Sequence, residues 1–516
     1  MQMPLNKSVL LNPAVVTLAS CAFLTSSGEV EKQRASNPNI IVILADDMGY
    51  GDVGCYNPES KIPTPNMDKL ASQGIRFLNA HSPAALSTPT RYGLLTGRYC
   101  WRTRLKEGVL IGYDEVSLIE HGRPTIASVL RDKGYHTAAI GKWHLGLNWQ
   151  TSDGYVIQND QDRWNIEPSA FQENEKHIDF SRPITGGPIE LGFDYFFGTA
   201  GCSTSDPPYC YIEQNLTVGI PSVMSPDDFR KLPGFAPGLM MPGFSLTGVD
   251  PDFTEKAIGF IKGHQDQQPG KPFFLYLALS SPHNPFLPPD FAKGKSTEGP
   301  RGDLVTVVDW SVGQILEVLK LYGLEKNTLV IVTSDNGAMK GANGHKSNGE
   351  YRGYKANIWD GGHRIPFIAR WPGKIGAGTE TSEVISLTDM FATISSLVSA
   401  KVKDGSGEDS YDVLPTFFGK HQEDSDTRVR VFHSGGGFFA IQKGPWKLIE
   451  GTKGSGSGKR AADDMPAMKA GQLYNVVEDP FETHDLWEKE PKVVSELMPL
   501  LETCKSVPAS VKIRKN

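Results

Sequence analysis

Cysteine is scarce in this chain: its 516 residues include 6 cysteines, and no two of them form a Cys-x-x-Cys pair. Such a low number excludes a small domain held together by a framework of disulfides. An excess of positive charge is also missing, since 52 Lys and Arg stand against 59 Asp and Glu. The resulting net charge of -7 argues against a nucleic acid as partner. The length and ordinary composition fit a globular enzyme of up to about three domains.

At the amino end, the apolar run is too short and too broken to span a bilayer. Residues 1–20 carry one charge, Lys7, and then a short apolar stretch interrupted by Asn12 and Pro13. This pattern predicts a secretory signal. The sequence Leu-Ala-Ser-Cys at residues 18–21 resembles a bacterial lipobox, which would make Cys21 the lipidated first residue of the mature protein. A plain cleaved signal is the alternative. We therefore expect an exported protein, periplasmic or anchored to the outer membrane through Cys21.

Four apolar runs each lead directly into a polar motif. They cover residues 39–44, 136–140, 273–279 and 328–333. Apolar runs without alternation are typical of buried strands in a largely parallel sheet. Helical patterns lie between them, at residues 126–133 and 308–322. The sequence thus predicts an α/β fold with a large, mostly parallel central sheet flanked by helices, and the four motifs at the carboxyl ends of its strands.

The polar motifs supply a set of metal-binding and anion-binding side chains. Each motif alone has an ordinary explanation, because Asp-Asp and Asp-Asn-Gly are common turns and a single His or Lys is usually structural. Together, Asp46, Asp47, Asp335 and Asn336 offer hard oxygen ligands for Ca²⁺ or Mg²⁺. The cationic side chains that would receive an anion are Arg91, Lys142, His144, His283 and Lys355.

Ser87 is the candidate nucleophile. It is predicted to cap the start of a helix that has Pro89 in its first turn, runs to about Leu95 and ends near Gly97. A helix start presents free N–H groups, which favour an oxyanion. Standing alone, the segment would be explained by a capping serine with no further role.

The segment Ser87-Thr-Pro-Thr-Arg91, followed by Leu94-Leu-Thr-Gly97, resembles the signature of formylglycine-dependent type I sulfatases. The family's other motifs follow in the same chain order: Asp46-Asp47, Gly141-Lys-Trp-His-Leu-Gly146, Ser281-Pro-His283, Asp335-Asn-Gly337, Arg352-Gly-Tyr-Lys355 and Trp359-Asp-Gly-Gly362. The departures are mild, with Thr90 where the family often has Ser and Asp360 where Glu is usual. The resemblance runs from about Asn39 to Gly373 and continues more weakly to the end.

The resemblance implies a fold, a modification and a set of roles. It implies the alkaline phosphatase-like fold and oxidation of Ser87 to formylglycine by a dedicated radical-type maturation enzyme. The cation, expected to be Ca²⁺, would be bound by Asp46, Asp47, Asp335, Asn336 and the modified residue 87. His283, with Lys355 beside it, would protonate the leaving alcohol, and His144 would take a proton when sulfate is eliminated. Lys142 and Arg91 would hold the sulfate oxygens and the nucleophile.

We divide the chain into four parts: a signal (1–20), a tether (21–37), a catalytic domain (38–400) and a C-terminal subdomain (401–516). In the catalytic domain, residues 147–248 are expected to form long loops over the pocket, and Cys202 and Cys210 could close a loop disulfide. Five aromatic residues there could stack on a sugar or simply pack: Trp149, Tyr155, Trp164, Tyr209 and Tyr211. We expect the residues that select the substrate to lie in this segment and near His345. Arg301-Gly-Asp303 is expected in a loop before a helix.

The C-terminal part is expected to form a small antiparallel subdomain. Its predicted elements are short strands at residues 429–432, 438–442, 446–450 and 473–477, a flexible tip at 451–458 and a helix at 492–505.

The function expected is hydrolysis of sulfate monoesters, on a sulfated carbohydrate or an aryl sulfate. Two alternatives stay open. One is a formylglycine phosphonate or phosphodiester hydrolase of the same superfamily. The other is a glycan-binding surface lipoprotein in which Ser87 is unconverted.

Overall fold

The computed structural model describes residues 37–113, 116–157, 168–451 and 470–510. The predicted signal, Cys21, almost all of the tether, Trp164 and nearly all of the flexible tip lie outside the described residues. Everything below concerns the compact unit that begins at Pro38. Within the described parts of this unit, no helix is both long and apolar enough to cross a membrane.

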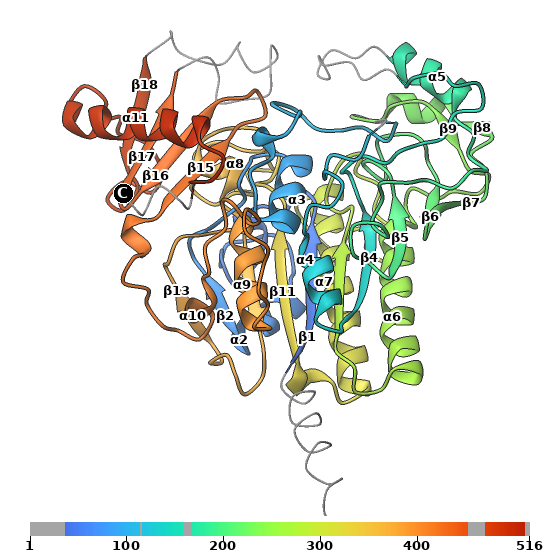
Figure 1. Cartoon of the computed structure of the whole chain (residues 1–516), viewed down its shortest axis with the longest axis horizontal. Coiled ribbons are helices and arrows are strands. Elements are labelled where there is room, and N and C mark those ends of the chain that lie inside the picture. Colours follow the sequence, from blue (N-terminus) through green and yellow to red (C-terminus); the bar gives the residue numbers. More distant parts are fainter. Residues whose placement is uncertain (1–36, 114–115, 158–167, 452–469, 511–516) are drawn as a thin grey trace, which may run out of the picture. The chain divides into compact units, whose positions relative to one another are not determined.

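A ten-stranded sheet forms the centre of the fold (Figure 1). Its order is β13 (Thr379–Thr381), β2 (Ile75–Phe77), β12 (Phe367–Arg370), β11 (Thr328–Ser334), β1 (Asn39–Ala45), β10 (Phe273–Ala278), β4 (His136–Lys142), β5 (Tyr195–Thr199), β6 (Tyr211–Glu213) and β7 (Leu216–Val218). The five strands from β11 to β5 are parallel, and antiparallel pairs join them to the flanking strands. The expected α/β class is confirmed, with a mixed sheet whose parallel centre contains the four predicted strands.

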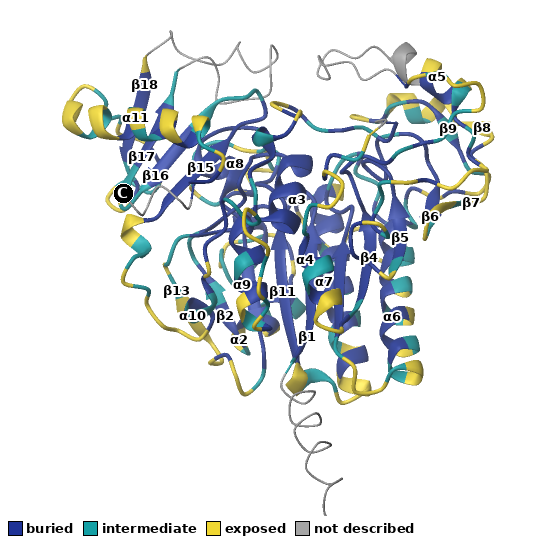
Figure 2. Ribbon diagram, viewed as in Figure 1, coloured by how far each residue is buried: buried dark blue, intermediate teal, exposed yellow. Residues whose placement is uncertain are grey.

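Helices cover both faces of the sheet. Ile40, Val42 and Leu44 of β1 face a core shared with α3 (Ser87–Thr96), α4 (Ile126–Asp132) and α9 (Met390–Leu397). Ile41 and Ile43 face a second core shared with α2 (Pro65–Ser72), α6 (Val249–Gln267) and α7 (Pro300–Leu321). Because both faces are covered, the central strands are buried throughout, as Figure 2 shows, and this explains their apolar runs.

A separate four-stranded antiparallel sheet lies near the carboxyl end. It consists of β15 (Val429–His433), β16 (Phe439–Lys443), β17 (Trp446–Glu450) and β18 (Gly471–Asn475), and α11 (Pro491–Ser506) packs on one face. The other face packs Phe432, Ile449 and Tyr474 against Ile358 and Trp359. The second sheet therefore supports the segment that carries the Trp-Asp-Gly-Gly motif.

The start of α7 differs from the sequence prediction. The helix begins at Pro300, so Arg301, Gly302 and Asp303 lie in its first turn rather than in a loop. Proline at the first helical position favours this start. Arg301 is buried and donates two hydrogen bonds to the Asp52 carboxylate, of 3.0 and 2.6 Å. Its role is thus structural, in the segment that follows the Asp46-Asp47 motif.

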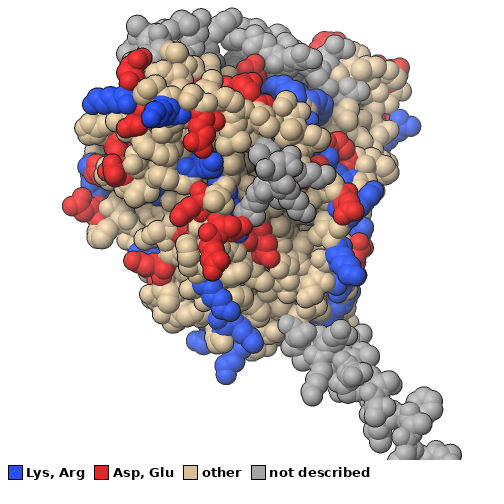
Figure 3. All heavy atoms as spheres, turned by 60° about the vertical axis from the view of Figure 1, so that its left-hand side comes forward, with Lys and Arg blue, Asp and Glu red and all other residues tan. Residues whose placement is uncertain are grey.

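Residues 147–248 contain short elements and long connections, as expected: α5 (Pro168–His177), β5, β6, β7, β8 (Val223–Met224) and β9 (Leu239–Met240). Trp149, Tyr209 and Tyr211 are buried here, so they pack within the fold. Tyr155 stacks on His177, with ring centroids 3.7 Å apart. Cys202 and Cys210 are both free thiols. On the face seen in Figure 3, Lys and Arg are interspersed with Asp and Glu.

Candidate active site

Three carboxylates and an amide meet where β1 and β11 end. The two strands are parallel neighbours, and their register pairs Ala45 with Ser334, so the residues that follow lie side by side. The Asp47 N–H donates to Asp335 Oδ1 (3.1 Å), and the Asn336 side chain donates to Asp47 Oδ1 (2.8 Å). Asp46, Asp47 and Asp335 each direct a carboxylate oxygen into one cluster in which these oxygens lie within 4.8 Å of one another.

This cluster has the chemistry of a site for a hard divalent cation. Asp46 Oδ1 and Asn336 Oδ1 are buried and accept no hydrogen bond in the described structure. Burial, followed by repulsion from Asp335, raises the pKa of Asp46 to about 7. Buried oxygens without partners are costly, and a cation would satisfy them. Oxygen-only donors fit Ca²⁺ or Mg²⁺.

Ser87 lies against the same cluster, in the first turn of α3. Its hydroxyl donates to Asp335 Oδ2 (2.7 Å) and accepts a hydrogen bond from Arg91 Nε (2.9 Å). Arg91, one helical turn further on, also donates to Asp335 Oδ2 (2.8 Å). The predicted capping role of Ser87 is wrong: Leu86 is the N-cap, and the Ser87 side chain makes no cap bond because it is committed to Asp335. The predicted end is confirmed, with α3 ending at Thr96 and Gly97 following at φ 65°.

His144 lies on the other side of Ser87. Its Nε2–H donates to the Leu110 carbonyl (2.7 Å), which leaves Nδ1 unprotonated, 3.2 Å from Ser87 Oγ. Burial lowers the pKa of His144 below its usual value. The imidazole is therefore neutral and has its free lone pair next to the Ser87 oxygen.

His283 has the opposite character. Its Nδ1–H donates to the Asn284 carbonyl (2.6 Å), and Nε2 lies 3.8 Å from Asp47 Oδ2. Burial and Lys355 lower its pKa, but the negative charges of Cys202, Asp47 and Asp46 outweigh them and raise the pKa to about 9. His283 is thus protonated at neutral pH and directs a proton on Nε2 toward the site.

Two lysines bring positive charge to the carboxylates. Lys142 at the end of β4 donates to Asp46 Oδ2, and Lys355 donates to Asp47 Oδ2 (2.8 Å). Lys142 is fully buried and Lys355 is partly exposed. Both have a raised pKa, because desolvation lowers it and the neighbouring carboxylates more than compensate. All ten residues predicted to be catalytic or metal-binding therefore lie in one connected cluster of side chains.

Sequence reasoning considered Cys202 only as a possible disulfide partner and did not single out Asp206. They follow β5, another apolar strand leading into a polar segment, and this signal is the same one that identified the other motifs. Cys202 Sγ lies 3.9 Å from His283 Nε2 and 4.0 Å from both ring nitrogens of His144. His345, by contrast, is buried and bound to Asp52 (3.0 Å), so it is part of the framework.

Comparisons with known proteins agree with this geometry. The family model described as "Sulfatase" matches residues 38–400. An N-acetylgalactosamine-6-O-sulfatase of Bacteroides thetaiotaomicron is 34% identical, over 96% of this chain and 98% of the relative. Human arylsulfatase A is 32% identical, over 88% and 84%. A solved structure from work on glycosaminoglycan metabolism by Bacteroides thetaiotaomicron superposes with a TM-score of 0.76 at 32% identity, over 92% of this chain and 100% of that one. The chain therefore belongs to the sulfatase family, whose members are sulfuric ester hydrolases.

Proposed function

We propose that this protein removes sulfate from a carbohydrate sulfate monoester, with a formylglycine made from Ser87 as nucleophile and Ca²⁺, or alternatively Mg²⁺, beside it. The observation that carries the proposal is the environment of Ser87 Oγ, which contacts Asp335, Arg91 and His144 at 2.7, 2.9 and 3.2 Å. A cation ligand, a guanidinium and a neutral imidazole meet at this one atom. The match to an N-acetylgalactosamine-6-O-sulfatase over nearly its whole length supports a sugar as substrate.

Asp46, Asp47, Asp335, Asn336 and the modified residue 87 would hold the cation. When present, the cation acidifies the nucleophile and offsets developing charge, and formylglycine supplies an aldehyde that is regenerated when sulfate leaves. Lys142 and Arg91, which contact Asp46 and Asp335, would hold the sulfate oxygens, and Lys355, which contacts Asp47, would assist His283 at the leaving group. Preorganised donors of this kind each lower a barrier by about 3 kcal/mol.

The two histidines would take opposite proton-transfer roles. His144 accepts a proton at Nδ1 from the oxygen at position 87, because its Nε2–H is bound to Leu110. His283 gives a proton from Nε2 to the departing sugar oxygen, because its Nδ1–H is bound to Asn284. Different surroundings thus make one imidazole the base and the other the acid.

The modification is tested by mass spectrometry of the tryptic peptide Phe77–Arg91 from protein made in its native host. Conversion of Ser87 removes two hydrogens, and the peptide loses about 2 Da. An intact serine would contradict the proposal and favour a binding protein. Ser87→Ala serves as the matched control, and we expect it to show neither the mass loss nor turnover.

The substrate class is tested with defined sulfated saccharides and matched phosphodiesters, using the matured enzyme loaded with Ca²⁺. We expect a higher kcat/KM on sulfated saccharides. Higher efficiency on the diesters would instead identify a phosphodiester hydrolase.

We further propose export and lipid attachment through Cys21, on the basis of the Leu-Ala-Ser-Cys sequence. Wild-type protein should partition with membranes, whereas Cys21→Ser should be recovered in the soluble fraction. Equal partitioning of the two proteins would favour a plain cleaved signal.

A further inference from the structure

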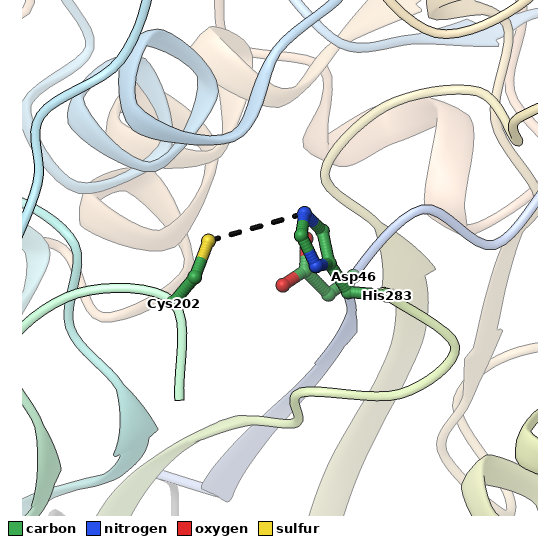
Figure 4. A group of neighbouring side chains, drawn as sticks. All are labelled: Asp46, Cys202 and His283. Atoms are coloured by element: carbon green, nitrogen blue, oxygen red, sulfur yellow. Dashed lines mark hydrogen bonds between the residues drawn. The ribbon is translucent and has the colours of Figure 1, made fainter. Parts of the chain in front are cut away.

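Cys202, His283 and Asp46 form a second cluster beside the oxygen-only one (Figure 4). One potential ligand atom from each of the three lies within 4.8 Å of the others. They come from three different segments, after β5, after β10 and after β1. The cluster mixes sulfur, nitrogen and oxygen donors, whereas the site between β1 and β11 offers oxygens.

We propose that this cluster is a site for a thiophilic divalent cation such as Zn²⁺, and that a metal bound there inhibits the enzyme. Zinc bonds are about 2.3 Å long to sulfur and about 2.1 Å to nitrogen, so one ion can touch both Cys202 Sγ and His283 Nε2 across their 3.9 Å separation. Thiolate and imidazole ligands select zinc and other soft metals over Ca²⁺ and Mg²⁺.

Each of the three residues offers a ligand atom, with two conditions: His283 Nε2 must give up its proton to bind a metal, and Asp46 is shared with the oxygen-only site. His283 Nδ1 is used by the Asn284 carbonyl, so Nε2 is the ring nitrogen that faces the cluster. Asp46 is fully buried, and its Oδ1 accepts no hydrogen bond in the described structure. Burial raises the pKa of Cys202, but Lys142, His144 and His283 outweigh it and hold the pKa well below the usual range. A thiolate is the form that binds metal.

The thiol is also held in place before any metal arrives. Asp206 Oδ2 accepts a hydrogen bond from the Cys202 backbone N–H (3.1 Å), and the Asp206 N–H donates to the Cys202 carbonyl (2.9 Å). Cys202 itself is 7% exposed, so the loop holds the sulfur in the interior, next to His144 and His283. Preorganised donors bind a metal without first having to be ordered.

Inhibition follows from which atom the metal would use. His283 Nε2 is the atom proposed to protonate the leaving oxygen, and a metal-bound nitrogen carries no proton. This consequence rests on the proposed role of His283, whereas binding of the metal does not.

Binding is tested by titrating Co²⁺ into the full-length protein, first without added Ca²⁺ and then with Ca²⁺ in excess, because Asp46 is shared by the two sites. We expect the near-ultraviolet charge-transfer band of a cobalt–thiolate bond in wild type and in Cys55→Ser, and its loss in Cys202→Ser. Cys55 is the matched control because it is a free thiol that lies outside the cluster and is less buried than Cys202. No band in wild type, or a band that persists in Cys202→Ser, would overturn the proposal.

Inhibition is tested on the matured enzyme, with each variant compared with its own metal-free rate. The Zn²⁺ concentration giving half inhibition should rise at least tenfold in Cys202→Ser and stay unchanged in Cys55→Ser. Equal sensitivity of wild type and Cys202→Ser would overturn the inhibitory claim. A cobalt–thiolate band without any zinc inhibition would support the site and contradict the acid role of His283.

Discussion

Backbone carbonyls decide the roles of the two active-site histidines. Each imidazole gives one N–H to a carbonyl, of Leu110 for His144 and of Asn284 for His283, and so presents one defined nitrogen to the pocket. His144 Nδ1 faces a hydroxyl, whereas His283 Nε2 faces the Asp47 carboxylate and the Cys202 sulfur. Cys202 lies near both rings, but burial outweighs its charge at His144, whereas neighbouring negative charge outweighs burial at His283. The two imidazoles therefore differ in protonation in the way that the proposed base and acid roles require.

His283→Ala should reduce turnover most for substrates with poor leaving groups. A sugar hydroxyl needs a proton to depart, and loss of a general acid costs about 10²–10⁴-fold. A nitrophenolate leaves without help, so kcat/KM for a nitrophenyl sulfate should fall far less. The measurement compares wild type and variant on both substrates. An equal loss on both would contradict the acid role.

At the scale of elements, the sheet places the site. The sequence was sufficient to predict four buried strands and the convergence of their polar ends. An apolar run indicates a buried strand, and the polar motif after it marks the carboxyl end of that strand at the edge of the sheet. Contacts set by tertiary packing were not predictable. Ser87 was expected to cap its own helix, but Asp335, 248 residues away, takes its hydroxyl. Arg301 was expected in a loop, but Asp52 draws it into a buried pair, and Cys202 had no local pattern linking it to His283.

The turn after β11 depends on glycine at position 337. A side chain there would place Cβ 2.0 Å from the Gly361 carbonyl oxygen, an impossible distance between backbone-fixed atoms. Gly337→Ala should therefore displace the Asp335-Asn336 turn and lower Ca²⁺ affinity by at least tenfold, measured by isothermal titration calorimetry. Gly259→Ala is the control, because it lies inside α6 with open space around its Cβ. Equal Ca²⁺ affinity in the two variants would refute the packing argument.

For the molecule as a whole, a buried polar chain joins the C-terminal sheet to the catalytic segments. Lys447 Nζ on β17 lies 3.1 Å from His363 Nε2, which also lies 3.1 Å from the Ile358 carbonyl oxygen. His363 Nδ1 lies 3.0 Å from His81 Nδ1, and His81 Nε2 lies 2.8 Å from Asn79 Oδ1. A hydrogen bond between the two Nδ1 atoms needs one of them to be unprotonated, and burial lowers the pKa of both rings, so both imidazoles are neutral at pH 7.

The two buried neutral histidines, His363 and His81, predict how the free energy of unfolding depends on pH. Burial, with Lys447 next, lowers the pKa of His363 to about 3, and burial also lowers that of His81. In the unfolded chain histidine titrates near 6.5, so below that pH the unfolded state binds protons that the folded state does not. The free energy of unfolding should fall from pH 7 to 4, by at most about 1.4 kcal/mol per pH unit for each histidine. Urea denaturation measures this slope, which His363→Gln should reduce and the exposed His484→Gln should leave unchanged. An unaltered slope in His363→Gln would argue against the neutral pair.

The contacts of Lys447 predict that the C-terminal sheet stabilises the active-site framework through this one lysine. Lys447 is fully buried and pairs with Asp360 and Glu482, both at 2.7 Å. Lys447→Met would leave two buried carboxylates facing each other, and breaking such a pair costs about 3–5 kcal/mol. Lys443→Met is the control on the neighbouring strand, because its partner Glu496 is exposed and the expected loss is below about 1 kcal/mol.

Lys447→Met should also weaken Ca²⁺ binding at temperatures well below the melting temperature of the variant. The reason is that Asp360 begins α8 (Asp360–His363), whose Gly361 packs on Gly337. Urea denaturation and calorimetry of the two variants measure both effects, and equal stability losses would show that the buried lysine has no special part in joining the sheet to the site.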